Sequence, residues 1–334
     1  MDSISLTPRA TALAYLGNLN KSGLVLTDIY KHVWIPEYFK ERDSEYIPES
    51  VLVDLLNYLH TSLNPSDFLL YLMTSANDAA LNHLHMLESK SCKVEDILSD
   101  VSLSMSNVPN QGILNFRSTN LAENSQSIDL LLPNSKDSNC VWLEMSFFFQ
   151  FILLIRHLIK GEWLPQQVNL QATDLRDLSE VLTFQKIDVR YGQPTSSFTI
   201  QSSVLERIVP KETFGKSERI KKGESSTQSA SFESTARLVI KNYVAQPEFS
   251  LDAFSEITNY SPRLIQVQLK KESTSFREIL EQERVEFAIK KLQTSRFQIS
   301  DISAQLGYSQ PSAFIRTFKR VTGLSPKQYL KAQI

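Results

Sequence analysis

The stretch that decides the fold lies near the C-terminus and reads ISDISAQLGYSQPSAFIRTFKR, residues 299–320. In it a small residue, Ser303, stands four positions before Gly307, a residue that adopts the positive φ of a tight turn at little cost. Two positions further on, Ser309 is of a type that caps helices. Because a small residue lets two helices cross closely, this spacing predicts a helix-turn-helix unit.

The same pattern occurs earlier in the chain, in LDAFSEITNYSPRLIQVQLKK, residues 251–271. Three pairs of residues stand 48 positions apart: Ser255 and Ser303, Asn259 and Gly307, Ser261 and Ser309. The second helix of each unit carries an apolar stripe, Ile265 and Leu269 in one and Phe314 and Phe318 in the other. Pro262 suits the first position of a helix. Two units at matched spacing are much more specific than one, and residues 275–292 between them keep the apolar spacing of a single connecting helix.

The charge of the chain is divided unevenly along it. Residues 1–210 hold 15 basic and 24 acidic side chains, a net of −9. Residues 232–334 hold 15 and 10, a net of +5, and residues 211–231 hold 5 and 3, a net of +2. An acidic and a basic part suggest two modules with different partners, the partner of the basic one being a polyanion. The alternative is that the basic part is only a solvated surface.

The boundary between the modules is predicted from composition. The segment from Pro210 to Ser231 is polar and has no apolar periodicity. We therefore expect a domain at 1–210, a flexible linker at 211–231 and a double helix-turn-helix domain at 232–334.

The first module is predicted to be α+β, with helices first and a small sheet later. Apolar residues recur at helical spacing up to about Leu98, and short strand-like runs follow, at 113–116, 128–132 and 168–170. Two further runs, 186–190 and 198–200, are expected to pair with each other across a turn. The most apolar stretch, Val141–Ile159, contains Glu144, Gln150, Arg156 and His157, so we expect a buried helix and not a membrane span.

No catalytic chemistry is evident in this module. His83 and His85 point to different faces of a helix, which argues against a metal pair. There is no phosphate-binding glycine loop and no nucleophile elbow. Cys92 and Cys140 are too few for a disulfide framework. We expect no catalytic residue, no metal and no cofactor, and the protein is interpreted as cytoplasmic, with no membrane segment, and as not being an enzyme.

The apolar helix is also the predicted ligand site. It has more apolar surface than one face of a small sheet covers, and a neighbouring helix, a second subunit or a small molecule are alternative partners for the remainder. We expect a small-molecule effector near Phe148, Phe151 and Ile152, and a homodimer formed through the N-terminal domain.

The C-terminal module resembles the DNA-binding domain of AraC/XylS-type transcription regulators. The resemblance depends on the connector Arg284…Ala288…Leu292 and on the closing run from Ile299 to Leu330, in which the LGYS, F-x-R-x-F and G-x-S-P elements match the family's most specific motif. More weakly, GEWLPQQVNL, VRYGQPTSSFTI and residues 205–210 are similar to the sensor domain of the regulators related to the ornithine-utilisation regulator, and not to the arabinose-binding cupin type.

The resemblance implies which residues contact DNA. For base contacts it implies Arg263, Gln266, Val267, Gln310, Ser312 and Arg316. For phosphate contacts we expect Ser261, Lys270, Lys271, Ser309, Lys319 and Arg320. Val267 and Asn259 depart from the family pattern, because another Arg and a Gly are more usual there.

The sequence as a whole thus predicts a bacterial, sequence-specific transcription regulator that responds to a small molecule and acts on promoter DNA with RNA polymerase as a partner. Two alternatives remain. In the first, the N-terminal domain only dimerises or binds partner proteins. In the second, an enzyme is fused to a DNA-targeting tail. The effector, the operator and the sign of regulation are not predicted.

Overall fold

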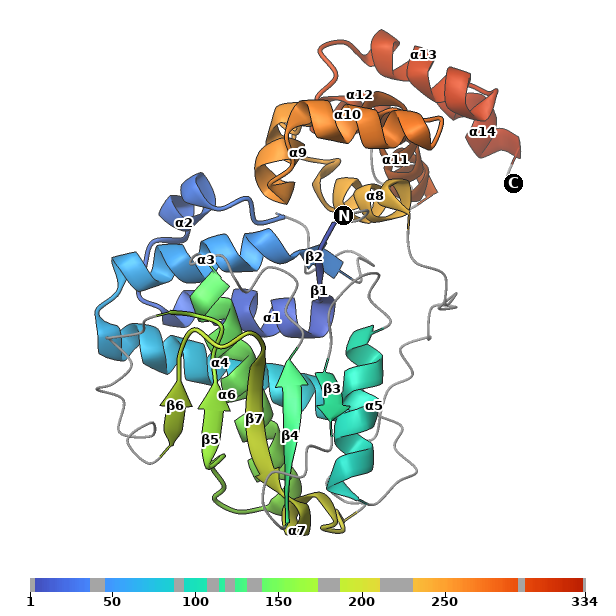
Figure 1. Ribbon diagram of the computed structural model, residues 1–334. Helices are drawn as coiled ribbons and strands as arrows, with labels where there is room; N and C mark the ends of the chain where they lie inside the picture. The colour runs from blue at the N-terminus through green and yellow to red at the C-terminus, as the bar shows by residue number, and fades with distance from the viewer. Residues whose placement is uncertain are drawn as a thin grey trace. The chain divides into compact units, whose positions relative to one another are not determined.

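The computed structural model describes residues 4–36, 46–86, 93–106, 114–117, 124–130, 140–173, 187–210, 231–293 and 298–332 (Figure 1). It divides into two compact units. Unit 1 comprises residues 1–4, 34–50 and 230–334, and unit 2 comprises residues 5–33 and 51–229. The predicted linker, 211–231, lies outside the described residues except for Ser231.

Unit 2 is built of helices around a small sheet. Its helices are α1 (Arg9–Asn18), the 3-10 turn η1 (Leu19–Lys21), α2 (Leu26–His32), most of α3 (Glu49–Ser62), α4 (Pro65–Met86), α5 (Val94–Ser106), α6 (Val141–Ile159) and α7 (Ser202–Leu205). Its strands are β1 (Leu6–Pro8), β3 (Leu114–Arg117), β4 (Ser125–Leu130), β5 (Gln167–Asn169), β6 (Asp188–Arg190) and β7 (Ser196–Gln201).

The five-stranded sheet has the order β3-β4-β7-β5-β6. All neighbours are antiparallel except β5 and β6, which are parallel. The expected pairing of 186–190 with 198–200 is therefore wrong: β5 lies between these strands, and Phe198 of β7 is opposite Val168 of β5. Ile128, Val168 and Phe198 are at most 1% exposed, so these neighbouring strands form one apolar face.

The core of unit 2 includes α6, as predicted. This helix is long and apolar enough to cross a membrane by length and composition, and a core helix passes the same test. In the structure 72% of its apolar window is buried. Glu144 and Gln150, two of the polar residues that argued against a span, are each 1% exposed and lie inside the protein.

Unit 1 is all-helical apart from β2 (Tyr46–Pro48). Its helices are α8 (Phe232–Tyr243), α9 (Leu251–Thr258), α10 (Pro262–Lys271), α11 (Phe276–Gln293), α12 (Ile299–Gln305), α13 (Pro311–Thr322) and α14 (Pro326–Ala332). The two helix pairs, α9–α10 and α12–α13, lie on either side of α11 in the chain, as the sequence predicts. An α+β N-terminal region and an all-helical C-terminal domain confirm the predicted fold class.

Helix α11 belongs to two cores at once. Its first half contributes Phe276, whose ring lies 5.3 Å from that of Phe254 in α9. Its second half contributes Val285, Ala288 and Leu292 to the cluster around Phe314 and Phe318 of α13. One continuous helix therefore fixes the two helix pairs relative to each other.

Segments far away in the sequence complete unit 1. Three side chains of α8 and the residues just after it donate to main-chain carbonyls there: Tyr243 to Trp34 at 2.7 Å, Asn242 to Tyr46 at 2.7 Å and Gln246 to Ile35 at 3.3 Å. The Trp34 indole donates to Glu256 of α9 at 3.0 Å. No pattern in the amino-acid sequence indicates this arrangement.

Candidate nucleic-acid interface

Helix α10 begins where the sequence predicts. Asn259 has a φ of 57°, the left-handed conformation of the turn, and Ser261 caps the helix by accepting from the Leu264 amide at 3.3 Å. Pro262 occupies the first helical position. Because Ile265 and Leu269 are fully buried, the opposite face of α10 is presented to solvent.

Helix α13 begins one residue later than expected. Gly307 makes the turn with a φ of 73°, but the N-cap residue is Gln310, without a side-chain hydrogen bond, and not Ser309. Pro262, the first residue of α10, follows Asn259 by three positions, whereas Pro311, the first residue of α13, follows Gly307 by four. The two units are thus 48 residues apart at the turn and 49 apart along the recognition helix, which explains why Ser309 does not cap it.

Tight packing fixes the second turn. A Cβ on Gly307 would lie 3.0 Å from the carbonyl oxygen of Pro247, so glycine is required there by space as well as by φ. The Arg284 guanidinium of α11 lies 5.4 Å from the centre of the Tyr308 ring, next to this turn. The turn is therefore fixed to the connecting helix and to the segment before α9.

All six residues predicted to contact bases are exposed. Arg263, Gln266 and Val267 lie on the outer face of α10. Gln310, Ser312 and Arg316 lie at the start and on the outer face of α13, opposite the buried Phe314 and Phe318. Guanidinium groups suit the O6 and N7 of guanine, and carboxamides suit the N6 and N7 of adenine, so these faces have the chemistry of major-groove reading.

The six predicted phosphate contacts are exposed too: Ser261, Lys270, Lys271, Ser309, Lys319 and Arg320. Four of them are cations in the last turn of α10 or α13. Arg320 differs from the other three because it forms an ion pair with Glu281 of α11, a carboxylate that also accepts from Arg277 at 3.1 Å. The pair with Glu281, which sequence reasoning missed, competes with a phosphate for this guanidinium.

Sequence reasoning also missed Leu264. It is 38% exposed, on the same face of α10 as Val267, which is 45% exposed. The signal was present, because a leucine beside the stripe of Ile265 and Leu269 is an apolar residue without a place in the core.

The predicted ligand residues lie in the core of unit 2. Phe148, Phe151 and Ile152 of α6 are at most 4% exposed. The rings of Phe148 and Phe151 lie 6.2 and 6.3 Å from that of Phe198 in β7. The structure thus brings the helix and the sheet together at these residues, with side chains filling the contact.

A buried carboxylate anchors α6 to the ends of β5 and β7 nearby. Glu144 accepts from the Ser196 hydroxyl at 2.5 Å and from the amides of Gln171 and Ala172 at 2.9 and 3.3 Å. Burial raises the pKa of this carboxyl, while the three hydrogen bonds oppose that rise. The three donors stabilise the ionised form of the carboxyl. Because they come from two other segments of the chain, Glu144 acts as a structural anchor between these segments and α6.

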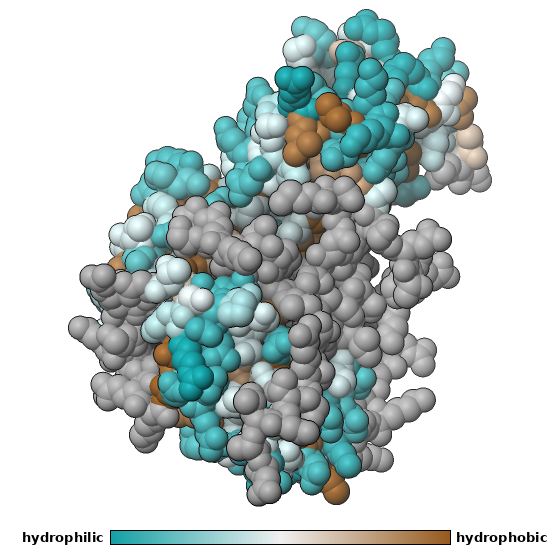
Figure 2. Space-filling model, in the orientation of Figure 1, coloured by the Kyte–Doolittle hydropathy of each residue, from teal (hydrophilic) through white to brown (hydrophobic). Residues whose placement is uncertain are grey.

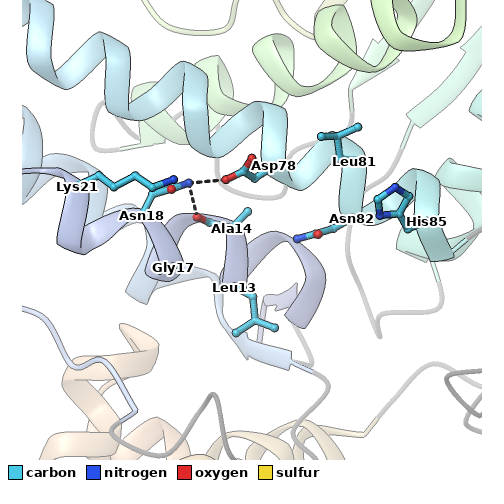
Figure 3. Close-up of a pocket in the computed structure, with 9 residues that line it drawn as sticks. All are labelled: Leu13, Ala14, Gly17, Asn18, Lys21, Asp78, Leu81, Asn82 and His85. Atoms are coloured by element: carbon cyan, nitrogen blue, oxygen red, sulfur yellow. Dashed lines mark hydrogen bonds between the residues drawn. The ribbon is translucent and has the colours of Figure 1, made fainter. Parts of the chain in front are cut away.

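A pocket of about 400 Å³ opens elsewhere in unit 2, between α1 and α4 (Figure 3). Its apolar part comprises Leu13, Ala14 and Leu81, and its polar groups include Lys21 and His85. Asn18 is held at its edge by a hydrogen bond of 2.9 Å to Asp78. The predicted ligand residues on α6 do not line it. Among the residues that the structure describes, no cluster of three potential metal ligands occurs.

Comparison with protein families agrees with this geometry. Residues 254–332 match the model of a family described as a helix-turn-helix domain. Over 98 residues the chain is 35% identical to the HTH-type transcriptional activator CsvR of Escherichia coli, covering 29% of this chain and 36% of that protein. Over 105 residues it is 31% identical to the virulence regulon transcriptional activator VirF of Shigella flexneri, covering 31% and 40%. The chain thus spans little more than a third of the length of the curated relatives it matches.

A solved structure, the transcriptional regulator CdpR from Pseudomonas aeruginosa, aligns over 96% of this chain and 97% of its own, with 17% identity and a TM-score of 0.36. The family model matches the C-terminal part alone, and these two sequence relatives match 29% and 31% of the chain.

Proposed function

We propose that the C-terminal domain of this chain is a helix-turn-helix DNA-binding domain of the AraC/XylS type, and that the whole chain is a bacterial transcription activator that responds to a small molecule. The family is one of regulators and not of enzymes. As a protein that acts on promoter DNA, it is expected in the cytoplasm, with RNA polymerase as a partner.

One observation carries the proposal: each of two helices held by α11 buries one stripe completely and exposes the face opposite. On α10 that face presents Arg263 and Gln266, and on α13 it presents Gln310 and Arg316. The cations in the last turns, Lys270 and Lys319 among them, are suited to the phosphates beside a groove. Ser312 and Val267 complete the proposed base contacts.

Footprinting of the full chain on a duplex selected from random sequence tests this proposal. We expect protection of two successive major-groove segments about 10 bp apart, because two recognition helices on one chain read one face of the duplex. Protection of a single groove segment, or no preference for any sequence, would contradict it.

The effector part of the proposal concerns unit 2. Residues 1–210 carry a net charge of −9 and gain nothing from a phosphate backbone, so their role is expected away from the duplex. The effector is proposed to bind between α6 and the sheet, at Phe148, Phe151 and Ile152, in a domain of the subgroup related to the ornithine-utilisation regulator. Dimerisation is proposed for the same domain.

Thermal unfolding of the full chain against a metabolite panel tests this part. A saturable rise in the unfolding temperature, reduced by Phe151→Leu, supports an effector at α6. The pocket between α1 and α4 supplies the comparison: a rise abolished by Leu81→Gln but unaffected by Phe151→Leu would move the site there. No shift with any compound, from a protein that light scattering shows to be a dimer, would favour the alternative in which the domain only binds proteins.

A further inference from the structure

The exposed face of α10 consists of two neighbouring rows of side chains. Arg263, Gln266 and Lys270 stand at i, i+3 and i+7, and are polar. Leu264, Val267 and Lys271 have the same spacing one position further on, so the second row is apolar until its last member. Figure 2 shows the apolar surface over α10 as a brown area surrounded by teal. The recognition helix therefore presents a hydrophobic strip beside its polar one.

This strip has no structural use within the described part of unit 1. The core below α10 is already formed by Ile265 and Leu269, which are fully buried, whereas Leu264 and Val267 are 38% and 45% exposed. Leaving such side chains in water forgoes the free energy of burial, so a partner that covers them is favoured.

The equivalent positions of the second recognition helix differ. With the 49-residue offset between the helices, Leu264 corresponds to Ala313 and Val267 to Arg316. The exposed Leu–Val pair is thus specific to α10 and is not a common requirement of the two helix pairs.

From these observations we propose that Leu264 and Val267 read the C5-methyl groups of thymine in the first half of the operator. In the major groove the thymine methyl is the apolar group among the donors and acceptors that base pairs present. Gln266, next to Val267, has the carboxamide that suits adenine, the base paired with thymine. The inference depends on the proposed function, and it adds the class of base that α10 selects.

The test replaces single thymines by deoxyuridine in a duplex selected by the full chain, which removes the methyl and nothing else. At one or two positions in one half of the site we expect a loss of about fourfold in affinity, the equivalent of ~0.8 kcal/mol for a buried methylene. Val267→Ala should weaken binding to the thymine duplex by a similar factor. It should have little further effect on the deoxyuridine duplex, because the contact is already absent.

Leu324→Ala is the matched control. Leu324 is 38% exposed, as Leu264 is, but follows α13 and is on no recognition helix. Any loss of affinity caused by Leu324→Ala should be equal on the thymine and deoxyuridine duplexes. Val267→Arg, which introduces the residue found at the equivalent position of α13, should abolish the deoxyuridine effect at its position and shift the selected base towards guanine.

The outcomes separate the two proposals. If the chain selects a sequence but deoxyuridine is without effect at every thymine, the methyl-reading inference is overturned and the proposed function stands. Equal losses for Val267→Ala on both duplexes would overturn it as well. If no sequence is selected at all, the proposed function itself fails.

Discussion

Gly307 combines two constraints that substitution can separate. Its φ of 73° costs an alanine roughly 1–2 kcal/mol, and its Cβ would also meet the carbonyl oxygen of Pro247 at 3.0 Å. Gly307→Ala should therefore destabilise the chain by about 2–5 kcal/mol in urea unfolding. Gly323, with a φ of 79° and no atom within 4 Å of a Cβ, is the control, and Gly323→Ala should cost about 1–2 kcal/mol. Equal losses would show that the contact with Pro247 contributes nothing.

A second residue-scale prediction concerns pH. His83 is 4% exposed, bonded to the Thr11 hydroxyl at 3.0 Å, and burial lowers its pKa from 6.5 to about 4. Between these values the unfolded chain binds a proton that the folded chain does not. The contribution of neutral His83 to the free energy of unfolding is thus complete above pH 6.5. It decreases as the pH falls towards 4, by up to about 3 kcal/mol.

Urea unfolding between pH 7 and pH 4 measures this loss. His83→Gln should make the stability profile flatter than that of the unmodified chain. The same substitution at His85, which is exposed on the same helix, should leave the slope as it is. An identical slope for His83→Gln and the unmodified chain would contradict the assignment.

At the scale of elements, α13 allows its two kinds of contact to be distinguished. Arg316→Ala should cost about 1–3 kcal/mol on the selected duplex and relax the preference at one or two positions, because its guanidinium is proposed to read a base. Lys319→Ala should weaken binding to every sequence alike and reduce the slope of affinity against salt by about one. Binding measured against salt on selected and random duplexes distinguishes them. Equal behaviour of the two variants would refute the roles given to these residues.

The contact of α6 with the ends of β5 and β7 leads to another prediction at this scale. In Glu144→Gln one carboxylate oxygen becomes an NH₂ group, which cannot accept from the Gln171 or Ala172 amide or from Ser196. Unit 2 should lose about 1–3 kcal/mol of stability. Glu162→Gln is the control, because Glu162 is exposed and pairs with Arg156 at the surface. Unchanged stability of Glu144→Gln would mean that these bonds contribute little.

At this scale, the features that depend on neighbouring residues could be predicted from the sequence, and those that depend on distant residues could not. The positive φ of Asn259 and Gly307, the Ser261 cap and the extent of α6 depend on neighbours in the chain, and the sequence predicts them well. The predicted N-cap of α13, Ser309, was wrong by one residue, because a turn tolerates an extra residue that the periodicity of the helices does not show. The pairing of β6 with β7 was wrong because β5, an earlier strand, lies between them. The order of the strands in the sheet therefore does not follow their order in the chain.

The whole molecule contains an arrangement that no pattern in the sequence indicates. Asn242, Tyr243 and Gln246 donate hydrogen bonds to the main-chain carbonyls of Tyr46, Trp34 and Ile35. Every residue has such a carbonyl, so side-chain chemistry gives no sign of which segment completes unit 1. The donors can be recognised, since Asn242 and Tyr243 are polar residues that are almost fully buried and need hydrogen-bond partners. Which residues supply these partners cannot be recognised in the same way.

This arrangement leads to a prediction that combines truncation with substitution. A fragment of residues 231–334 lacks the carbonyls of Trp34 and Tyr46, so its unfolding temperature should lie below that of unit 1 in the full chain. In the full chain, Asn242→Ala with Tyr243→Phe should cost about 1–3 kcal/mol, because two buried carbonyls lose their donors. In the fragment the same pair should cost clearly less, since the partners are already absent.

Differential scanning calorimetry of the four proteins gives this comparison, and the non-additivity of the two changes is the quantity of interest. Thr322→Val is a control, because the Thr322 hydroxyl bonds only to main-chain groups near it in the chain: the carbonyls of Phe318 and Leu324 and the amide of Leu324. It should cost the same in fragment and full chain. If the fragment is as stable as unit 1 in the full chain, the N-terminal segments do not stabilise the DNA-binding domain. If it is less stable, or does not fold, the segments that hold Trp34, Ile35 and Tyr46 stabilise the domain through their hydrogen bonds to α8 and the residues just after it.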